Sequence, residues 1–235
     1  MHEHKEEPRI IAELDEFAVI EKPAGLLVHP GPHPSDEPTL TDWILRRFPE
    51  AATVGDAPEI RPGIVHRLDR ATSGVMLVAR TQAGFDRLKV LFQARGIEKE
   101  YRAIAHGTLH PAAGRIDRPI GIRPRSVKRS VFSDRMRKDA VTRYAVVEQL
   151  PTVADLAVFP ETGRTHQIRV HLSSLGHPVV GDALYAPKRK VPAVPRLMLH
   201  ASALRFELDA ARHEYVAPAP PAFDELLEGL RAGEV

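Results

Sequence analysis

The sequence predicts an α+β fold, in which helices flank a mixed, mainly antiparallel β-sheet. Two observations carry this prediction: the predicted strands outnumber the predicted helices, and the two kinds of element do not alternate strictly along the chain. A doubly wound α/β fold would require that alternation. Proline and glycine are spread along the chain, and no internal repeat occurs. We therefore expect a single domain over residues 1–235.

The N-terminal part of the chain predicts a hairpin followed by a helix. Residues 9–14 and 17–22 are apolar stretches separated by an acidic two-residue turn, and a Pro-Ala-Gly sequence ends the second stretch. Thr39 is a suitable N-cap for a helix over 40–48, where large apolar residues recur at near-helical spacing. The Gly- and Pro-rich stretch up to Gly63 is expected to be a loop.

The rest of the chain predicts a buried strand, an amphipathic helix and further strands. Residues 75–79 form a continuous apolar run, and 82–95 carry apolar residues at helical spacing before Gly96. The remaining predicted elements are strands over 99–107, 141–148, 153–159 and 197–208, and helices over 164–175 and 223–231.

Composition narrows the class of protein and its chemistry. With 235 residues, 43% of them hydrophobic and 27% charged, the chain has an ordinary globular composition. It shows neither a signal peptide nor an apolar run long enough for a membrane span, so we expect a cytoplasmic protein that does not bind membranes. There are no cysteines, which excludes disulfides, thiolate nucleophiles and cysteine-bound zinc. Catalysis must therefore use oxygen or nitrogen side chains.

Charge is arranged in blocks. Residues 1–60 carry a net charge of −8, 61–143 carry +12, and 144–235 carry −2. The basic residues are densest over 118–143, where arginine outnumbers lysine, as is typical of phosphate-binding surfaces. A polyanion is the partner that this segment favours, and the alternative is a solvated basic face paired with the acidic N-terminal third.

Common catalytic motifs are absent from the sequence. It contains no GxGxxG, GxxxxGK[ST], HExxH or GxSxG pattern, so nucleotide-dependent, zincin and α/β-hydrolase chemistries have no support. Two histidine pairs, His2 with His4 and His29 with His33, have chelating spacing, but the first pair lies at the N-terminus and the second lies among prolines without a carboxylate at ligand spacing. We interpret both pairs as surface histidines and expect no metal and no cofactor.

Two clusters of polar residues stand beside predicted sheet elements. The first, 63–75, places His66, Arg67 and Asp69 directly before the buried strand, where a rigid scaffold can carry catalytic groups. An ordinary turn stabilised by Asp69 would give the same spacing. The second cluster, 162–172, places His166 and Arg169 on one side of the predicted helix, from which Arg169 could reach a carboxylate, although lone arginines are more often on the surface.

One aromatic residue also stands out. Tyr101 is expected to share a sheet face with Ala103 and Ala105, which leaves space above its ring. A tyrosine in a sheet is, however, most often part of the core.

Together these segments resemble the RluA-type family of pseudouridine synthases over nearly the whole chain. Six matching stretches occur in the order found in that family, and the HRLD sequence at 66–69 is the most specific. The stretches are VIEKPAGLLVHP (19–30), GIVHRLDRATSGVMLVAR (63–80), KEYRAIAHG (99–107), AVTRYAVVE (140–148), TGRTHQIRVHLSSLGHPVVGD (162–182) and LHASALRF (199–206).

The resemblance implies a single catalytic domain over residues 1–235 that isomerises uridine to pseudouridine in ribosomal or transfer RNA without a cofactor or metal. Many members of the family carry a small basic RNA-binding module ahead of this domain, and we expect no such separate N-terminal module here, since the first matching stretch begins near the start of the sequence. By motif match, Asp69 is the catalytic aspartate, Tyr101 packs on the target base, and Arg169 forms an ion pair with the aspartate. Arg67 fills the gap left by the flipped-out nucleotide. His66, Arg164 and His166, in the same motifs, are assigned to substrate binding.

Several alternatives stay open at this stage. The aspartate can act as a nucleophile at C1′ or as a base that removes a ribose proton. A non-catalytic RNA-binding protein would share the basic segment but would not need Asp69. A glycosidase that releases uracil would be expected to carry a second carboxylate, which we do not identify. The expected partner is a structured rRNA or tRNA stem-loop, and the protein is expected to be a monomer.

Overall fold

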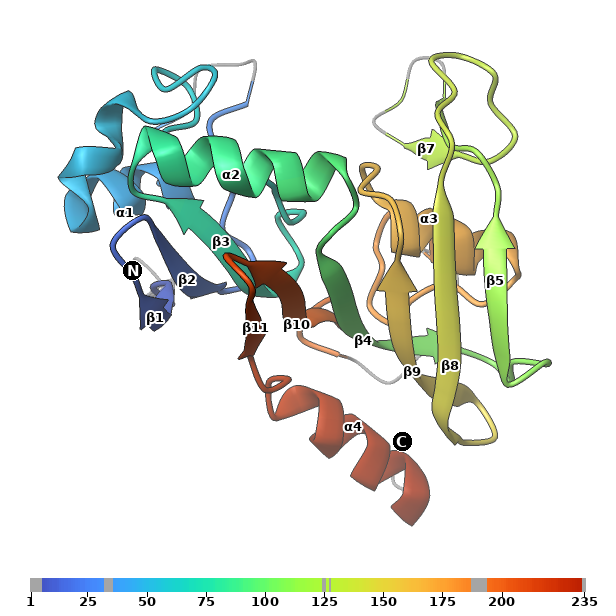
Figure 1. Ribbon diagram of the computed structural model, residues 1–235. Coiled ribbons are helices and arrows are strands. Elements are labelled where there is room, and N and C mark those ends of the chain that lie inside the picture. Colours follow the sequence, from blue (N-terminus) through green and yellow to red (C-terminus); the bar gives the residue numbers. More distant parts are fainter. Residues whose placement is uncertain (1–5, 32–35, 124–125, 127, 187–193, 234–235) are drawn as a thin grey trace. The chain divides into compact units, whose positions relative to one another are not determined.

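The computed structural model describes residues 6–31, 36–123, 126, 128–186 and 194–233 and confirms the predicted fold class (Figure 1). Its described residues form strands β1–β11, helices α1–α4 and a short 3-10 helix, η1 (Pro49–Thr53). They fall into two compact units, which we describe separately. Unit 1 comprises Met1–Glu98 and Ala203–Ala217, and unit 2 comprises Lys99–Ser202 and Pro218–Val235. The histidines at positions 2, 4 and 33 lie outside the described residues.

Unit 1 is built around an antiparallel sheet. Strand β2 (Phe17–Lys22) pairs with β1 (Arg9–Glu13) on one side and with β3 (Ser73–Ala79) on the other. All seven residues of β3 are buried, as the continuous apolar run predicts for a strand covered on both faces. Strand β11 (Ala211–Val216) pairs antiparallel with the end of β10 (Leu199–Leu208).

Two helices complete unit 1. Helix α1 (Leu40–Arg47) begins at Thr39, whose side chain accepts from the backbone N–H of Asp42 in a capping box, as its sequence position predicts. Helix α2 (Gln82–Gln93) packs beside β3 (Figure 1). A Cβ atom at Gly84 would lie 2.4 Å from the carbonyl oxygen of Glu16, so only glycine allows this close approach of α2 to the β1–β2 turn.

Unit 2 is built around a second antiparallel stretch of sheet. Strand β9 (Val153–Pro160) pairs with β4 (Glu98–His106) and β8 (Val141–Gln149), and β8 pairs with β5 (Ala113–Asp117). Strands β6 (Gly121–Ile122) and β7 (Arg129–Ser130) form a separate small ribbon within the basic segment.

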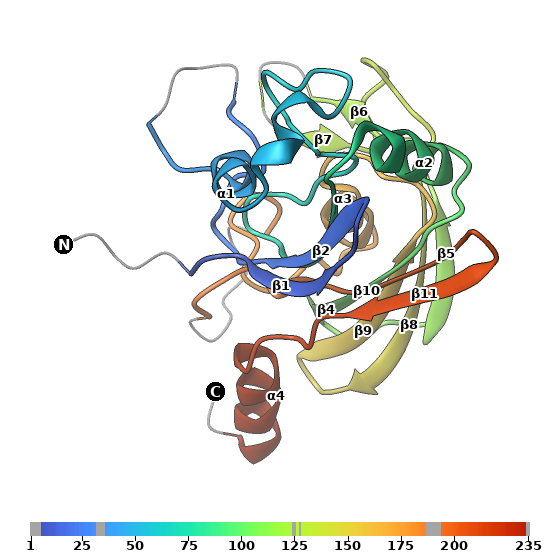
Figure 2. The ribbon, with the colours of Figure 1, turned by 60° about the vertical axis from the view of Figure 1, so that its left-hand side comes forward.

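Two helices belong to unit 2. Helix α3 (Gln167–Ser174) packs against β8 and β9 (Figure 2), and its Val170 joins a buried cluster with Ile120 and Ala140. Helix α4 (Ala222–Ala232) is anchored by the fully buried Phe223, over whose ring the Arg102 guanidinium lies at 5.5 Å. The sheet of unit 2 therefore supports α3, which carries Arg169 and follows directly after Arg164 and His166.

Candidate active site

The loop that carries the HRLD sequence is attached directly to β3. Gly63 adopts φ +67°, and a Cβ atom there would lie 2.5 Å from the carbonyl oxygen of Ala79. The N–H of Ala79 donates to the carbonyl of Gly63 at 2.9 Å, and Ile64 forms a bridge with Val78. The loop thus leaves the edge of a fully buried strand, which restricts its motion.

His66 is held by the scaffold of unit 1. Its Nε2 accepts the backbone N–H of Leu77 at 2.9 Å, so its proton in the neutral form lies on Nδ1. The ring stacks on Phe92 of α2, with ring centroids 4.5 Å apart. These contacts fix the start of the HRLD sequence against β3 and α2. The predicted role of His66 in substrate binding stays a prediction.

Asp69 lies half-buried in a turn of the same loop. The backbone carbonyl of Asp69 accepts the N–H of Thr72 at 3.1 Å, and the preceding Leu68 is buried. Arg67, in contrast, is exposed, and its Nη1 lies 3.0 Å from Nε2 of His29. The loop therefore buries its leucine and presents its arginine to solvent, an arrangement in which Arg67 is accessible to a large ligand.

Lys22, to which the sequence motifs assign no role, contacts the loop that holds Asp69. Its side chain is fully buried at the end of β2, and Nζ donates to the carbonyls of Pro23, Leu26 and Arg70 at 2.7, 2.9 and 3.3 Å. The N–H of Gly25 donates to the same carbonyl of Arg70 at 2.7 Å. A buried ammonium bonded to three carbonyls clamps the segment after β2 to the loop that holds Asp69. The only sequence signal is a lysine at the end of an apolar strand.

The sheet register in unit 2 places Tyr101 on the face that α3 covers. Tyr101 pairs directly with Val158, which pairs with Tyr144, and directly paired residues of an antiparallel sheet project to the same face. Thr142, two residues from Tyr144, lies on that face too and bonds to His171 of α3. The predicted common face of Tyr101, Ala103 and Ala105 agrees with this register.

Arg169 is buried rather than exposed, and it pairs with a carboxylate that the sequence analysis did not identify. Its Nε and Nη2 donate to the two carboxylate oxygens of Asp182 at 2.7 and 2.8 Å. Burial alone would raise the pKa of Asp182, but the hydrogen bonds and charge of Arg169, together with the N–H groups of Tyr185 and Leu184, lower it. Asp182 is therefore ionised, and it holds the Arg169 guanidinium in one orientation.

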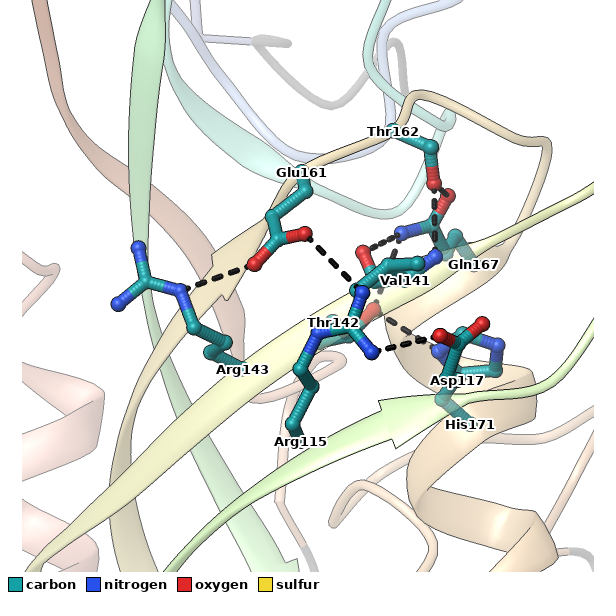
Figure 3. Close-up of polar contacts among 9 residues, drawn as sticks. All are labelled: Arg115, Asp117, Val141, Thr142, Arg143, Glu161, Thr162, Gln167 and His171. Carbon is teal, nitrogen blue, oxygen red and sulfur yellow. Dashed lines mark hydrogen bonds and ion pairs between the residues drawn. The ribbon is translucent and has the colours of Figure 1, made fainter.

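A buried polar network sets the start of α3 (Figure 3). Gln167 donates to the carbonyl of Val141 and to the Thr142 hydroxyl, and its Oε1 accepts from the Thr162 hydroxyl at 2.6 Å. The ring of His171 lies between Thr142 Oγ1, at 2.8 Å from Nδ1, and the carbonyl of Arg118, at 2.9 Å from Nε2. Because a carbonyl only accepts, Nε2 carries the proton, and burial lowers the pKa of His171.

The remaining predicted residues of this unit lie at the N-terminal end of α3. The Nε of Arg164 donates to the carbonyl of Asp139 at 2.9 Å. His166 adopts φ +57°, and its Nδ1 lies 3.0 Å from the Tyr185 hydroxyl. Because the left-handed conformation of His166 cannot continue a helix, α3 begins only at Gln167. The predicted start at Arg164 is therefore wrong by three residues.

The structure thus assembles the predicted residues in two groups, which are His66, Arg67 and Asp69 in unit 1 and Tyr101, Arg164, His166 and Arg169 in unit 2. The predicted ion pair between Asp69 and Arg169 stays a prediction. A buried arginine fork and a half-buried carboxylate on a fixed loop are suited to acid–base or nucleophilic chemistry. The described residues contain no group of three or more potential metal ligands.

Comparison with known proteins decides the family. A model of the RNA pseudouridylate synthase family matches residues 16–174. The chain belongs to this family. It is therefore an RNA pseudouridine synthase, which is an isomerase, and the resemblance found in its sequence motifs is confirmed.

Individual relatives extend the match beyond residue 174. Ribosomal large subunit pseudouridine synthase D of Vibrio vulnificus is 40% identical over 94% of this chain and 70% of the relative. An uncharacterized RNA pseudouridine synthase of Chloroflexus aurantiacus is 42% identical over 89% of this chain and 65% of the relative. The solved structure of human RNA pseudouridylate synthase domain containing 1 has a TM-score of 0.74 and 28% identity and covers 99% of this pseudouridine synthase and 98% of that chain.

The family match includes every predicted site residue. It contains Lys22, Asp69, Tyr101 and Arg169, whereas Asp182 lies beyond its end. Within the part of the chain that the structure describes, no helix of this pseudouridine synthase is both long and apolar enough to span a membrane.

Proposed function

We propose that this pseudouridine synthase isomerises uridine in ribosomal RNA and that Asp69 is its essential carboxylate. Relatives named ribosomal large subunit pseudouridine synthase D, from Vibrio vulnificus and Pseudomonas aeruginosa, are 40% and 38% identical to it over more than nine-tenths of the chain. This similarity supports ribosomal RNA over transfer RNA as the substrate. The basic residues concentrated over 118–143 suit any structured RNA, because they neutralise phosphates.

The reaction is an isomerisation that needs one carboxylate. The N1–C1′ bond of uridine breaks, the uracil turns, C5 bonds to C1′, C5 loses its proton, and N1 ends protonated. The reaction consumes no water, transfers no electrons and uses no phosphate donor. Asp69 serves either as the nucleophile that bonds to C1′ or as the base that removes a ribose proton, and both roles require the ionised form.

The observation that carries the assignment of Asp69 is the fixation of its loop. Lys22 bonds three carbonyls around the loop, and His66 accepts the N–H of Leu77 from β3. A carboxylate that must meet one sugar atom benefits from such a scaffold, because small misplacements cost large factors in rate. An ordinary solvent-facing turn would not need a buried ammonium to hold it.

The other roles follow from chemistry and position. We assign Tyr101 to stacking on the target base, because the residue is half-buried and so keeps part of its surface accessible. Arg169 is assigned to pairing with Asp69, which would favour the ionised carboxylate. The target nucleotide must leave its stack, at a cost of a few kcal/mol, and we assign the exposed Arg67 to the gap that it leaves. His66, Arg164 and His166 are assigned to substrate contacts near these groups.

Mapping pseudouridine in cells tests the proposal. Ribosomal and transfer RNA from cells with and without the gene are mapped chemically, since the product is an isomer of equal mass. We expect one or more large-subunit ribosomal sites to disappear and to return with the wild-type gene or with Asp86→Asn, a change at an exposed α2 carboxylate that accepts a hydrogen bond from Gln82. Asp69→Asn should not restore them.

Other outcomes would replace the proposal. Loss of a site in transfer RNA alone would overturn the substrate, and restoration by Asp69→Asn would overturn the catalytic assignment. Release of free uracil by the purified protein would indicate a hydrolytic glycosidase instead.

A further inference from the structure

Tyr185 contacts both α3 and the basic segment of unit 2. Its ring lies beside Arg169 of α3, with the Arg169 Cζ 5.2 Å from the ring centroid. Its hydroxyl accepts the backbone N–H of Arg129 in β7 at 2.9 Å. The same hydroxyl lies 3.0 Å from Nδ1 of His166. One side chain therefore contacts Arg169, His166 and the basic segment.

The backbone of Tyr185 reinforces the hold on Arg169. The Tyr185 N–H donates to Oδ1 of Asp182 at 3.0 Å, and the same oxygen accepts Nη2 of Arg169 at 2.8 Å. The guanidinium is thus fixed at its edge by a carboxylate and on its face by an aromatic ring, a combination that restrains both its position and its tilt. The two restraints come from residues three positions apart on one short loop.

The Arg129 contact connects Tyr185 to the phosphate-binding segment. Residues 118–139 contain eight lysines and arginines and two aspartates. Tyr185 also packs against the cluster formed by Ile120, Ala140 and Val170, which joins both ends of this segment to α3. The hydroxyl bond fixes β7, in the middle of the segment, against the start of the helix.

We propose that Tyr185 is a positioning residue for pseudouridine formation, whose ring orients Arg169 and whose hydroxyl holds the basic segment in register with α3. The inference rests on the proposed function, because it takes Arg169 as part of the catalytic machinery and RNA as the ligand of the basic segment. It assigns the two halves of one side chain to separate steps: the hydroxyl to RNA engagement and the ring to turnover.

Two substitutions separate these contributions. Tyr185→Phe removes the hydroxyl and keeps the ring, so we expect KM for the RNA to rise about 5-fold while kcat stays within about 2-fold, as expected for lost ground-state binding. Tyr185→Leu removes the ring as well, and we expect kcat to fall about 10-fold or more. If kcat is retained in Tyr185→Phe but lost in Tyr185→Leu, the aromatic ring itself is needed for turnover. General destabilisation would not produce this difference.

Tyr144→Phe is the matched control. Tyr144 lies in β8 of the same unit, and its hydroxyl donates to the carbonyl of Pro111 at 3.3 Å, not to Arg129 or His166. We expect its kcat and KM to match the wild type. Unfolding temperatures are measured for all three variants, so that a change in kinetics is compared with a change in stability.

The outcomes distinguish this inference from the proposed function. A wild-type protein that forms no pseudouridine in ribosomal RNA overturns the proposed function. An active wild type with Tyr185→Phe kinetics equal to wild type, or with equal losses in Tyr185→Phe and Tyr144→Phe, overturns the role of the hydroxyl. If Tyr185→Leu fails to fold, the role of the ring is tested by comparing kcat in Tyr185→Trp and Tyr185→Met. Tryptophan retains an aromatic face, so Tyr185→Trp must keep the higher kcat; equal values would overturn the role of the ring.

Discussion

Asp182 holds the guanidinium of Arg169 by two parallel hydrogen bonds, of 2.7 and 2.8 Å, in the interior of unit 2. Both side chains are nearly inaccessible to solvent, so each charge depends on the other for compensation. The orientation of the Arg169 guanidinium therefore depends on Asp182.

Replacing Asp182 by Asn tests this dependence. The amide keeps the shape but removes the negative charge that accepts both hydrogen bonds from the buried Arg169, so we expect the free energy of unfolding to fall by about 3 kcal/mol. We expect kcat to fall as well. Denaturant unfolding and single-turnover assays measure the two effects. The control is Asp117→Asn, which affects the exposed pair with Arg115 and should change stability by less than about 0.5 kcal/mol.

The lowered pKa of His171 predicts that the protein loses stability in mildly acidic solution. Its pKa is lowered by burial, so between the folded pKa and about 6.5 the unfolded chain binds a proton that the folded chain excludes. Stability is complete above about pH 6.5 and falls as the pH drops toward the folded pKa, with a slope of at most about 1.4 kcal/mol per pH unit for one proton.

The measurement is denaturant unfolding between pH 8 and pH 5.5, in the wild type and in His171→Asn. The pKa of Asp182 is also lowered, but its contribution is lost only at pH values below its ordinary range near 4, outside this window. We expect the variant to be less stable at pH 8 and to show a smaller decrease on acidification. Identical pH slopes in the two proteins would contradict the assignment.

Lys22→Met tests the clamp in unit 1. Methionine fills similar space but removes the ammonium donor from the carbonyls of Pro23 and Leu26 and leaves that of Arg70 with the Gly25 N–H alone, so we expect a loss of about 2–3 kcal/mol in stability and a slower reaction through a looser Asp69 loop. Lys89→Met removes the exposed pair with Asp56 and serves as the control. Equal stabilities of the two variants would show that the buried ammonium is not the clamp.

The basic segment predicts a salt-dependent affinity for RNA. If the exposed Arg135 contacts a phosphate, Arg135→Ala should lower the slope of log K against log salt by about 0.7–0.9. Arg46→Ala, an exposed arginine in the acidic N-terminal third, should leave the slope unchanged. Filter binding from 50 to 300 mM salt measures both, and an unchanged slope for Arg135→Ala would exclude that phosphate contact.

Strong apolar patterns were sufficient to predict most elements. The run at 75–79 corresponds to β3, and the amphipathic stretch at 82–95 corresponds to α2. Strands β5 and β11 were missed because β5 buries only Ile116 and β11 buries no residue, so neither has an apolar run to detect. The short ribbon of β6 and β7 is too brief for periodicity to register.

The sequence nominates candidate site residues but does not predict the contacts that hold them. Motifs marked Asp69, Tyr101 and Arg169, yet helical spacing placed Arg169 on the side away from the apolar stripe, whereas the structure buries it. Asp182 lies 13 residues later on a loop, and no local rule connects it to Arg169. The same limit applies to Lys22, whose carbonyl partner at Arg70 is 48 positions away. Contacts between distant segments arise from tertiary packing, which spacing does not encode.

The most direct test of the account is a single-turnover assay of Asp69→Asn on a large-subunit ribosomal RNA transcript, with Asp86→Asn as the control. The account predicts no detectable pseudouridine from Asp69→Asn, with RNA affinity within about 2-fold of wild type, because the substitution removes the reacting charge without removing phosphate contacts. Asp86→Asn should react as the wild type does. Conversion by Asp69→Asn at the wild-type rate would contradict the central claim.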